Sequence, residues 1–117
     1  MGRGLNKVML IGRLGKNPIV GNTTKGKPMS KFNIANTRTW TSASGKQKEA
    51  TEWFNIVAWG KLAEICNLYL KKGSQVYIEG RLQTLKWEDE KGKTNSKIEI
   101  VANELIMLGN KKEPLDG

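Results

Sequence analysis

The alternation of apolar and polar residues predicts a chain built mainly of β-strands. Five segments either alternate with the two-residue period of a half-buried strand or are rich in Val, Ile, Leu and aromatic residues. They are residues 5–14, 29–38, 51–59, 75–87 and 97–108. Gly12 and Gly80 fall inside the first and fourth segments, which predicts a bulge or bend at each glycine.

The third segment also indicates which way its side chains face. Phe54, Ile56 and Ala58 share one face of the predicted strand, and Trp53 and Trp59 share the other. Because the first face carries the residues suited to a core, we expect the two tryptophans to lie outside it. Six residues separate them, which is about 20 Å along a strand.

One segment, residues 61–72, has the period of a helix. Leu62, Ile65, Cys66 and Tyr69 recur at i, i+3, i+4 and i+7 and form one apolar stripe. Gly73 is placed to end this helix, with two lysines completing its last turn. The position of Cys66 on the stripe favours a packed core thiol over a reactive one.

The predicted order is three strands, a helix and two strands, which is the order of a five-stranded OB-fold barrel (β-β-β-α-β-β). We therefore expect an all-β domain with one helix over residues 1–109, followed by a short flexible segment over residues 110–117. OB barrels bind oligonucleotides through their second and third strands and the loops after the first and fourth. Polar or basic loops are expected at residues 21–28, 41–48 and 88–96.

Composition argues against catalysis and against bound metals. The 117 residues include no histidine and one cysteine, so neither the usual zinc sites nor a histidine-dependent triad can form. The only acidic cluster, residues 88–90, lies in a predicted turn, where a solvated loop is favoured over a metal site. We expect a protein that is not an enzyme and binds no cofactor. The single cysteine suits a reducing cytosol.

Charge is distributed unevenly along the chain. Residues 1–48 hold ten Lys/Arg and no Asp/Glu, a balance of +10, whereas residues 49–117 hold ten basic and eleven acidic residues, a balance of −1. This asymmetry favours nucleic acid as the partner over an anionic membrane surface, although a basic protein without a special partner would also show it. The longest apolar runs are four residues, far too short to span a bilayer, so no membrane partner is expected.

The four tryptophans, Trp40, Trp53, Trp59 and Trp87, stand beside polar or basic residues rather than in apolar runs. Exposed aromatic rings interleaved with Lys and Arg suit unpaired nucleic acid, because the rings stack on bases while the cations follow the phosphates. The alternative is that some of these tryptophans are buried, and Trp59, just before the helix, is the one for which burial is weighed most heavily.

Long motifs in register resemble one family. Residues 3–18 (RGLNKVMLIGRLGKNP), 51–59 (TEWFNIVAW), 60–64 (GKLAE) and 72–80 (KGSQVYIEG) closely resemble bacterial-type single-stranded DNA-binding proteins, and the similarity covers about residues 3–109. The resemblance implies binding of single-stranded DNA without strong sequence preference, in DNA replication, recombination and repair. It also implies a cytoplasmic, nucleoid-associated protein.

The resemblance further implies residue roles and an assembly. Trp40, Trp53 and Trp87 match base-stacking tryptophans of the family, and Trp59 matches an aromatic stacking position that is often phenylalanine. Basic positions along the DNA path are matched by Arg3, Lys61, Lys72 and Lys86. A homotetramer, a dimer of dimers, is implied, with residues 6–10 pairing two subunits edge to edge and residues 75–79 on the surface where dimers meet.

The sequence departs from the family pattern in three places. Asn55 and Leu85 stand where many relatives carry a basic residue. Residues 111–117 (KKEPLDG) also lack the acidic tip with which such proteins recruit others, so recruitment of replication and repair proteins is not expected.

Two alternatives to single-stranded DNA binding stay open: a monomeric RNA-binding or cold-shock-like OB module, and an interaction module without affinity for nucleic acid.

Overall fold

The computed structural model describes residues 4–108. Arg3 and the segment 110–117, which carry two of the predictions above, lie outside the described residues. The elements run in the order β1 (Val8–Leu14), β2 (Ile19–Asn22), β3 (Pro28–Thr41), β4 (Gln47–Trp59), α1 (Gly60–Tyr69), β5 (Gln75–Glu88) and β6 (Thr94–Leu108). The five predicted strands and the helix are present, and β2 is a short sixth strand that the sequence reading missed.

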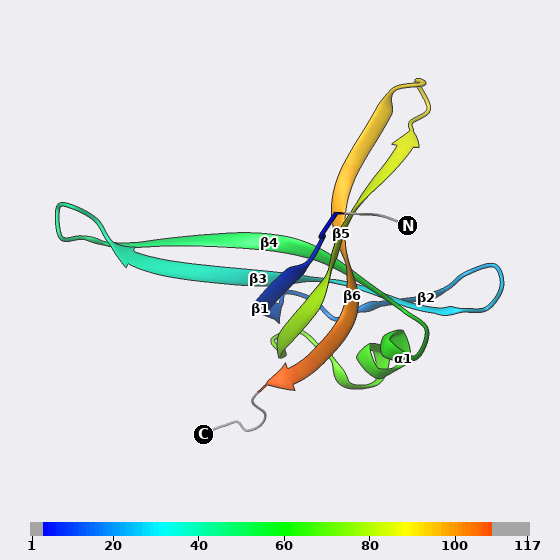
Figure 1. The fold of residues 1–117 in the computed structure, drawn as a ribbon, viewed down its shortest axis with the longest axis horizontal. Helices are drawn as coiled ribbons and strands as arrows, with labels where there is room; N and C mark the ends of the chain where they lie inside the picture. Colours follow the sequence, from blue (N-terminus) through cyan, green and yellow to red (C-terminus); the bar gives the residue numbers. More distant parts are fainter. Residues whose placement is uncertain (1–3, 109–117) are drawn as a thin grey trace.

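Five of the strands close into a barrel in the order β1-β5-β6-β4-β3, and β1 completes the ring by pairing with β3 (Figure 1). The closing contact is short, Arg13 opposite Ala35 and Leu14 opposite Ile34. The β4–β6 pair is parallel and the other pairs are antiparallel. This is the five-stranded OB barrel that the element order predicted. β2 lies outside the ring as a partner of β3.

The core is made by the inward faces of the strands. Four strands, β3 to β6, each contribute one isoleucine that is almost completely buried: Ile34, Ile56, Ile78 and Ile100. Phe54 packs against this cluster but is only partly buried. Helix α1 contacts β3, β4 and β6 and adds Ala63 and Cys66 to the core.

The two glycines singled out in the sequence both lie where backbones approach closely. The strand register shifts between Glu79 and Gly80, so the bulge predicted in β5 is confirmed. Gly12 lies just before β1 passes from β5 to β3, and a Cβ atom there would lie 2.6 Å from the carbonyl oxygen of Ala35. A side chain at Gly12 would therefore prevent the barrel from closing at this point.

The helix differs from its prediction at its end and in its buried face. It ends at Tyr69 rather than residue 72, and Leu70 is already extended. Gly73 adopts a positive φ of 91° in the turn that follows, so it does not terminate the helix. Tyr69 is 62% exposed, and Ala63 takes the buried position instead. The buried stripe is therefore Ala63 and Cys66, continued by Leu70 just beyond the helix, and it is rotated from the predicted stripe.

The predicted loops are tighter than expected because the strands run further into them. The β3–β4 hairpin remains paired out to Thr41 and Gln47, and the β5–β6 hairpin out to Glu88 and Thr94. Figure 1 shows these two hairpins and the β2–β3 hairpin projecting from the barrel as three separate arms. The OB barrel thus carries three projecting arms.

Candidate nucleic-acid interface

The outward faces of β3, β4 and β6 form one continuous surface beside the barrel core. On β3 and β4 the facing pairs are Asn33 with Asn55, and Ala35 with Trp53. Val57 of β4 lies beside Val101 of β6, so the outward residues of β6 that precede Val101 join the same surface. The alternation of the strands therefore places Trp53 on a surface shared by three strands.

This surface contains a hollow of about 210 Å³. Three segments supply its basic side chains, with Lys16 coming from the segment before β2, Lys31 from β3 and Lys97 from β6. Asn55 and Glu99 also line it. The hollow is cationic on balance, which suits a polyanionic ligand.

Trp53 lies at the edge of this surface, and its ring lies close to the backbone of Gly15. The side chain is 56% exposed. A Cβ atom on Gly15 would lie 2.6 Å from the ring, so the ring can lie close to the backbone only because residue 15 is a glycine. An exposed ring held against a rigid support is arranged to stack on a planar ligand.

All four tryptophans are outside the core, as predicted, with exposed fractions of 41% for Trp40, 56% for Trp53, 37% for Trp59 and 47% for Trp87. Trp87 faces the same side of β5 as Leu85, whose partner on β6 is Lys97, so it belongs to the surface around the hollow. Trp59 is the last residue of β4 and the N-cap of α1.

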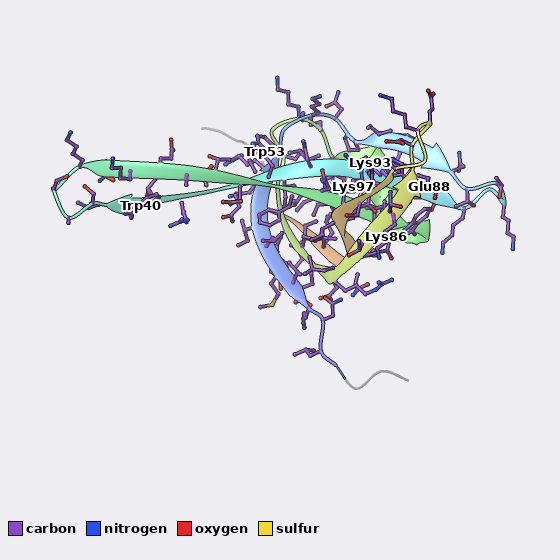
Figure 2. The ribbon with its side chains drawn as sticks, turned by 90° about the horizontal axis from the view of Figure 1, so that it is seen from above. Trp40, Trp53, Lys86, Glu88, Lys93 and Lys97 are labelled. Atoms are coloured by element: carbon purple, nitrogen blue, oxygen red, sulfur yellow. The ribbon has the colours of Figure 1, made fainter. Side chains whose placement is uncertain are left out.

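Trp40 lies apart from the other three. It faces Lys48 near the end of the β3–β4 arm, and by alternation it continues the face of β3 that carries Ile34, not the outward face (Figure 2). The guanidinium carbon of Arg38 lies 4.6 Å from the centroid of the Trp40 ring. Trp40 thus belongs to the arm, which lies beyond the hollow.

Three of the predicted DNA-binding cations, Lys61, Lys72 and Lys86, lie within the described residues. They lie around the outward surface of β3, β4 and β6, but not all of them lie on it. Lys61 is exposed and lies 4.0 Å from Glu64, one turn along the helix. The backbone N–H of Lys72 donates to Oδ1 of Asn17, which lines the hollow, over 2.8 Å. Lys86 pairs with Ser96 on the opposite face of the β5–β6 arm from Trp87, apart from Lys93 and Lys97 (Figure 2).

The sequence prediction did not include the lysines of the hollow, Lys16, Lys31 and Lys97, nor three lysines at the arm tips, Lys27, Lys46 and Lys93. The same type of turn holds each of the three at the arm tips. The arms end in Thr23-Thr-Lys-Gly-Lys27, Ser42-Ala-Ser-Gly-Lys46 and Asp89-Glu-Lys-Gly-Lys93. In each turn the first side chain accepts a hydrogen bond from the N–H of the last residue, and the glycine has a φ near +80°. The pattern Thr/Ser/Asp-x-x-Gly-Lys in the sequence is the signal that would have located these exposed lysines.

The acidic cluster at residues 88–90 belongs to one of these turns. Asp89 accepts hydrogen bonds from the backbone N–H groups of Lys93 and Lys91 and from the side chain of Asn95. The bond from Lys93 contributes most to lowering the pKa of Asp89 below its usual range. The cluster therefore has a structural use in the turn. No group of three or more His, Cys, Asp or Glu residues suited to a metal occurs within residues 4–108.

The two departures from the family pattern have different surroundings. Asn55 lines the hollow beside lysines from other segments, so a neutral residue there leaves the hollow cationic. Leu85 lies opposite Lys97 on the β5–β6 arm.

Among the described residues, no helix is long and apolar enough to cross a membrane.

Comparisons with known proteins agree with this geometry. The model of the single-strand binding protein family matches residues 5–108. The chain belongs to this family. Family members are binding proteins without catalytic activity, so the expectation that the chain is not an enzyme is confirmed.

Two relatives show how much of the chain the similarity covers. "Single-stranded DNA-binding protein 1" of Chlorobaculum tepidum is 54% identical over 95% of this chain and 69% of its own length. The single-stranded DNA-binding protein of Neisseria meningitidis serogroup A is 46% identical over 97% of this chain. The chain spans 65% of the length of the Neisseria protein.

Solved structures show the same fold. The Plasmodium falciparum SSB complex with ssDNA has a TM-score of 0.84 and 30% identity, and the match covers 93% of this chain and 99% of that one. A deletion mutant of the Thermus aquaticus single-stranded DNA binding protein has a TM-score of 0.80 and 32% identity, covering 95% of this chain and 54% of that one.

Proposed function

We propose that this protein binds single-stranded DNA without strong sequence preference and so protects and organises it during replication, recombination and repair. The observation that carries the proposal is Trp53, an exposed ring held on Gly15 beside a hollow lined by three lysines. Family membership and the similarity to a solved SSB complex with ssDNA support it.

Single strands are the better ligand for such a surface. A base can stack on an exposed ring only when its face is free, and in a duplex each face is covered by a neighbouring pair. Trp53 and Trp87 would stack bases on the surface around the hollow, and Trp59 would extend the path along β4. Trp40, on the other face of the β3–β4 arm, would stack a base where the strand passes around that arm. Lys61 and Lys72 would neutralise phosphates along this path, and Lys86 would do so on the other face of the β5–β6 arm, where the strand passes around it. Arg3, outside the described residues, is proposed as a further phosphate contact.

We also propose the homotetramer, a dimer of dimers, as the working assembly, acting at the nucleoid in the cytoplasm. Within residues 4–108, β1 has a strand partner on both sides only at its end, and residues 8–12 pair with β5 alone. Such an unpaired edge is a template for pairing with a second chain. This supports the expectation that residues 6–10 join two subunits edge to edge.

The outward face of β1, β5 and β6 suits the second contact. It carries exposed Met9, Ile11 and Ile106 around Tyr77. Tyr77 donates a hydrogen bond to Glu79, and this bond is the main cause that raises the pKa of Tyr77 to about 12. The same face also carries Glu79 and Glu104, and Glu79 forms an ion pair with Lys7. Apolar side chains around polar groups that are paired within the chain can pack against a copy of themselves, which supports residues 75–79 as the surface between dimers.

Binding of oligo-dT, oligo-U and duplex DNA of one length, followed by tryptophan fluorescence at one salt concentration, tests the proposal. We expect quenching and tight binding for oligo-dT and much weaker binding for the duplex. A preference for oligo-U would favour the RNA-binding alternative, and absence of binding to all three would favour the interaction module. Light scattering on the same samples reports the assembly.

A further inference from the structure

The hollow contains a buried acid that phosphate binding does not explain. Glu99 is only 3% exposed, yet it lines the hollow together with Lys16, Lys31 and Lys97. Nζ of Lys31 lies 3.5 Å from Oε2 of Glu99. That separation is longer than the about 2.7–2.9 Å of a charge-assisted hydrogen bond.

A buried carboxylate with one distant partner keeps most of its capacity to accept hydrogen bonds. An ionised carboxylate has about four acceptor positions, and burying it is costly unless they are used. Asn33, which also lines the hollow, has a buried amide oxygen without a hydrogen-bond partner within the described residues. The hollow therefore calls for a ligand that donates hydrogen bonds.

The charge of Glu99 decides which part of a DNA strand can enter. A phosphate brought against it would meet a like charge at close range, in surroundings that screen charge poorly. The amino group of a base meets an acceptor instead, while the lysines around the hollow remain available to phosphates outside. The volume of about 210 Å³ is that of about seven water molecules at roughly 30 Å³ each, enough for one base without its sugar.

We propose that this hollow is a base-binding subsite that selects a base with an exocyclic amino group, cytosine above all. The proposal rests on the proposed binding of single-stranded DNA. Carboxylates accept from the N4 amino group of cytosine, whereas uracil and thymine place an acceptor oxygen at the same position and gain no such hydrogen bond. Stacking elsewhere on the surface tolerates any base, so the subsite adds a moderate preference to otherwise general binding.

The test compares oligo-dC with oligo-dU of the same length, at one salt concentration. The two strands carry the same phosphates and differ at the edge of the ring, so the electrostatic part of the affinity cancels. We expect the wild-type protein to bind oligo-dC at least about fivefold more tightly, which corresponds to the low end of one specific base contact. Glu99→Gln should bring the two affinities within about twofold of each other.

Glu52→Gln is the matched control, because Glu52 is an exposed carboxylate of β4 outside the hollow and its loss changes the net charge equally. This variant should keep the preference for oligo-dC. A wild-type ratio within about twofold, or an unchanged ratio in Glu99→Gln, overturns the base subsite while general binding stands. Failure to bind either strand would overturn the proposed function itself.

Thermal unfolding shows first whether Glu99→Gln is folded, since the change leaves Lys31 without its partner. If it is not folded, the test uses the wild-type protein and an oligonucleotide of N4,N4-dimethylcytosine, a base that keeps the ring but has no amino hydrogens. We expect this strand to lose the preference over oligo-dU. Binding as tight as that of unmodified oligo-dC would overturn the proposal.

Discussion

Replacing Trp53 with alanine separates stacking from folding more cleanly than any other change on this surface. The ring is more than half exposed, and it rests on the backbone at Gly15 rather than in the core. Ile56, three residues further along β4, is 1% exposed and points the other way, into the barrel. The two positions on one strand therefore make a matched pair for an exposed and a buried side chain.

The structure gives different magnitudes for the two changes. Base stacking is worth about 1–3 kcal/mol per base in single-strand-binding OB folds, the family of this chain, so Trp53→Ala should raise the Kd by about 5- to 150-fold. A buried aromatic residue replaced by alanine costs about 3–5 kcal/mol of stability, and the exposure of Trp53 reduces this to about 2 kcal/mol or less. Ile56→Ala should cost about 2–5 kcal/mol.

Fluorescence anisotropy of a labelled oligo-dT gives the Kd, and denaturant unfolding of the same samples gives the stability. Trp53→Ala should stay folded and bind weakly, and Ile56→Ala should lose stability while its folded fraction binds normally. Trp53→Phe, which keeps a ring, should recover part of the affinity. The reasoning is refuted if Trp53→Ala unfolds the protein, or if it binds oligo-dT as tightly as the wild type.

Three further predictions follow from other parts of the structure. The log of the affinity for oligo-dT should fall with the log of the salt concentration at about −0.7 per phosphate neutralised, and an affinity insensitive to salt would contradict the cationic hollow. Gly15→Ala should weaken binding by displacing the Trp53 ring, and it should have no further effect in a Trp53→Ala background, as a double-mutant cycle would show. Burial raises the pKa of the Cys66 thiol from 9.0 to about 11, so the unfolding free energy should fall as pH rises from about 9 to 11. In Cys66→Ala this dependence should be weaker, with a remainder from Tyr77, whose pKa is also raised in the folded protein. An equal pH dependence in the two proteins would show that the thiol ionises equally in both states.

The sequence alone determined those features that depend on neighbours along the chain. The two-residue alternation around Ile56 placed Trp53 outside the core, because successive side chains of any strand face opposite sides. The bulge at Gly80 and the presence of a helix after Trp59 follow from local composition in the same way. The charge excess of residues 1–48 likewise needed no structure.

Only the tertiary structure decided what lies beside what. Lys31 and Glu99 meet because β4 pairs with β3 on one side and with β6 on the other, and no local pattern encodes that arrangement. Which face of α1 is buried, and hence the exposure of Tyr69, depends on how the helix packs against β3, β4 and β6. Trp40 lies apart from the hollow because the β3–β4 pairing continues past the barrel. Strand pairing joins residues distant in sequence, and the hollow exists because such pairings bring β3, β4 and β6 together.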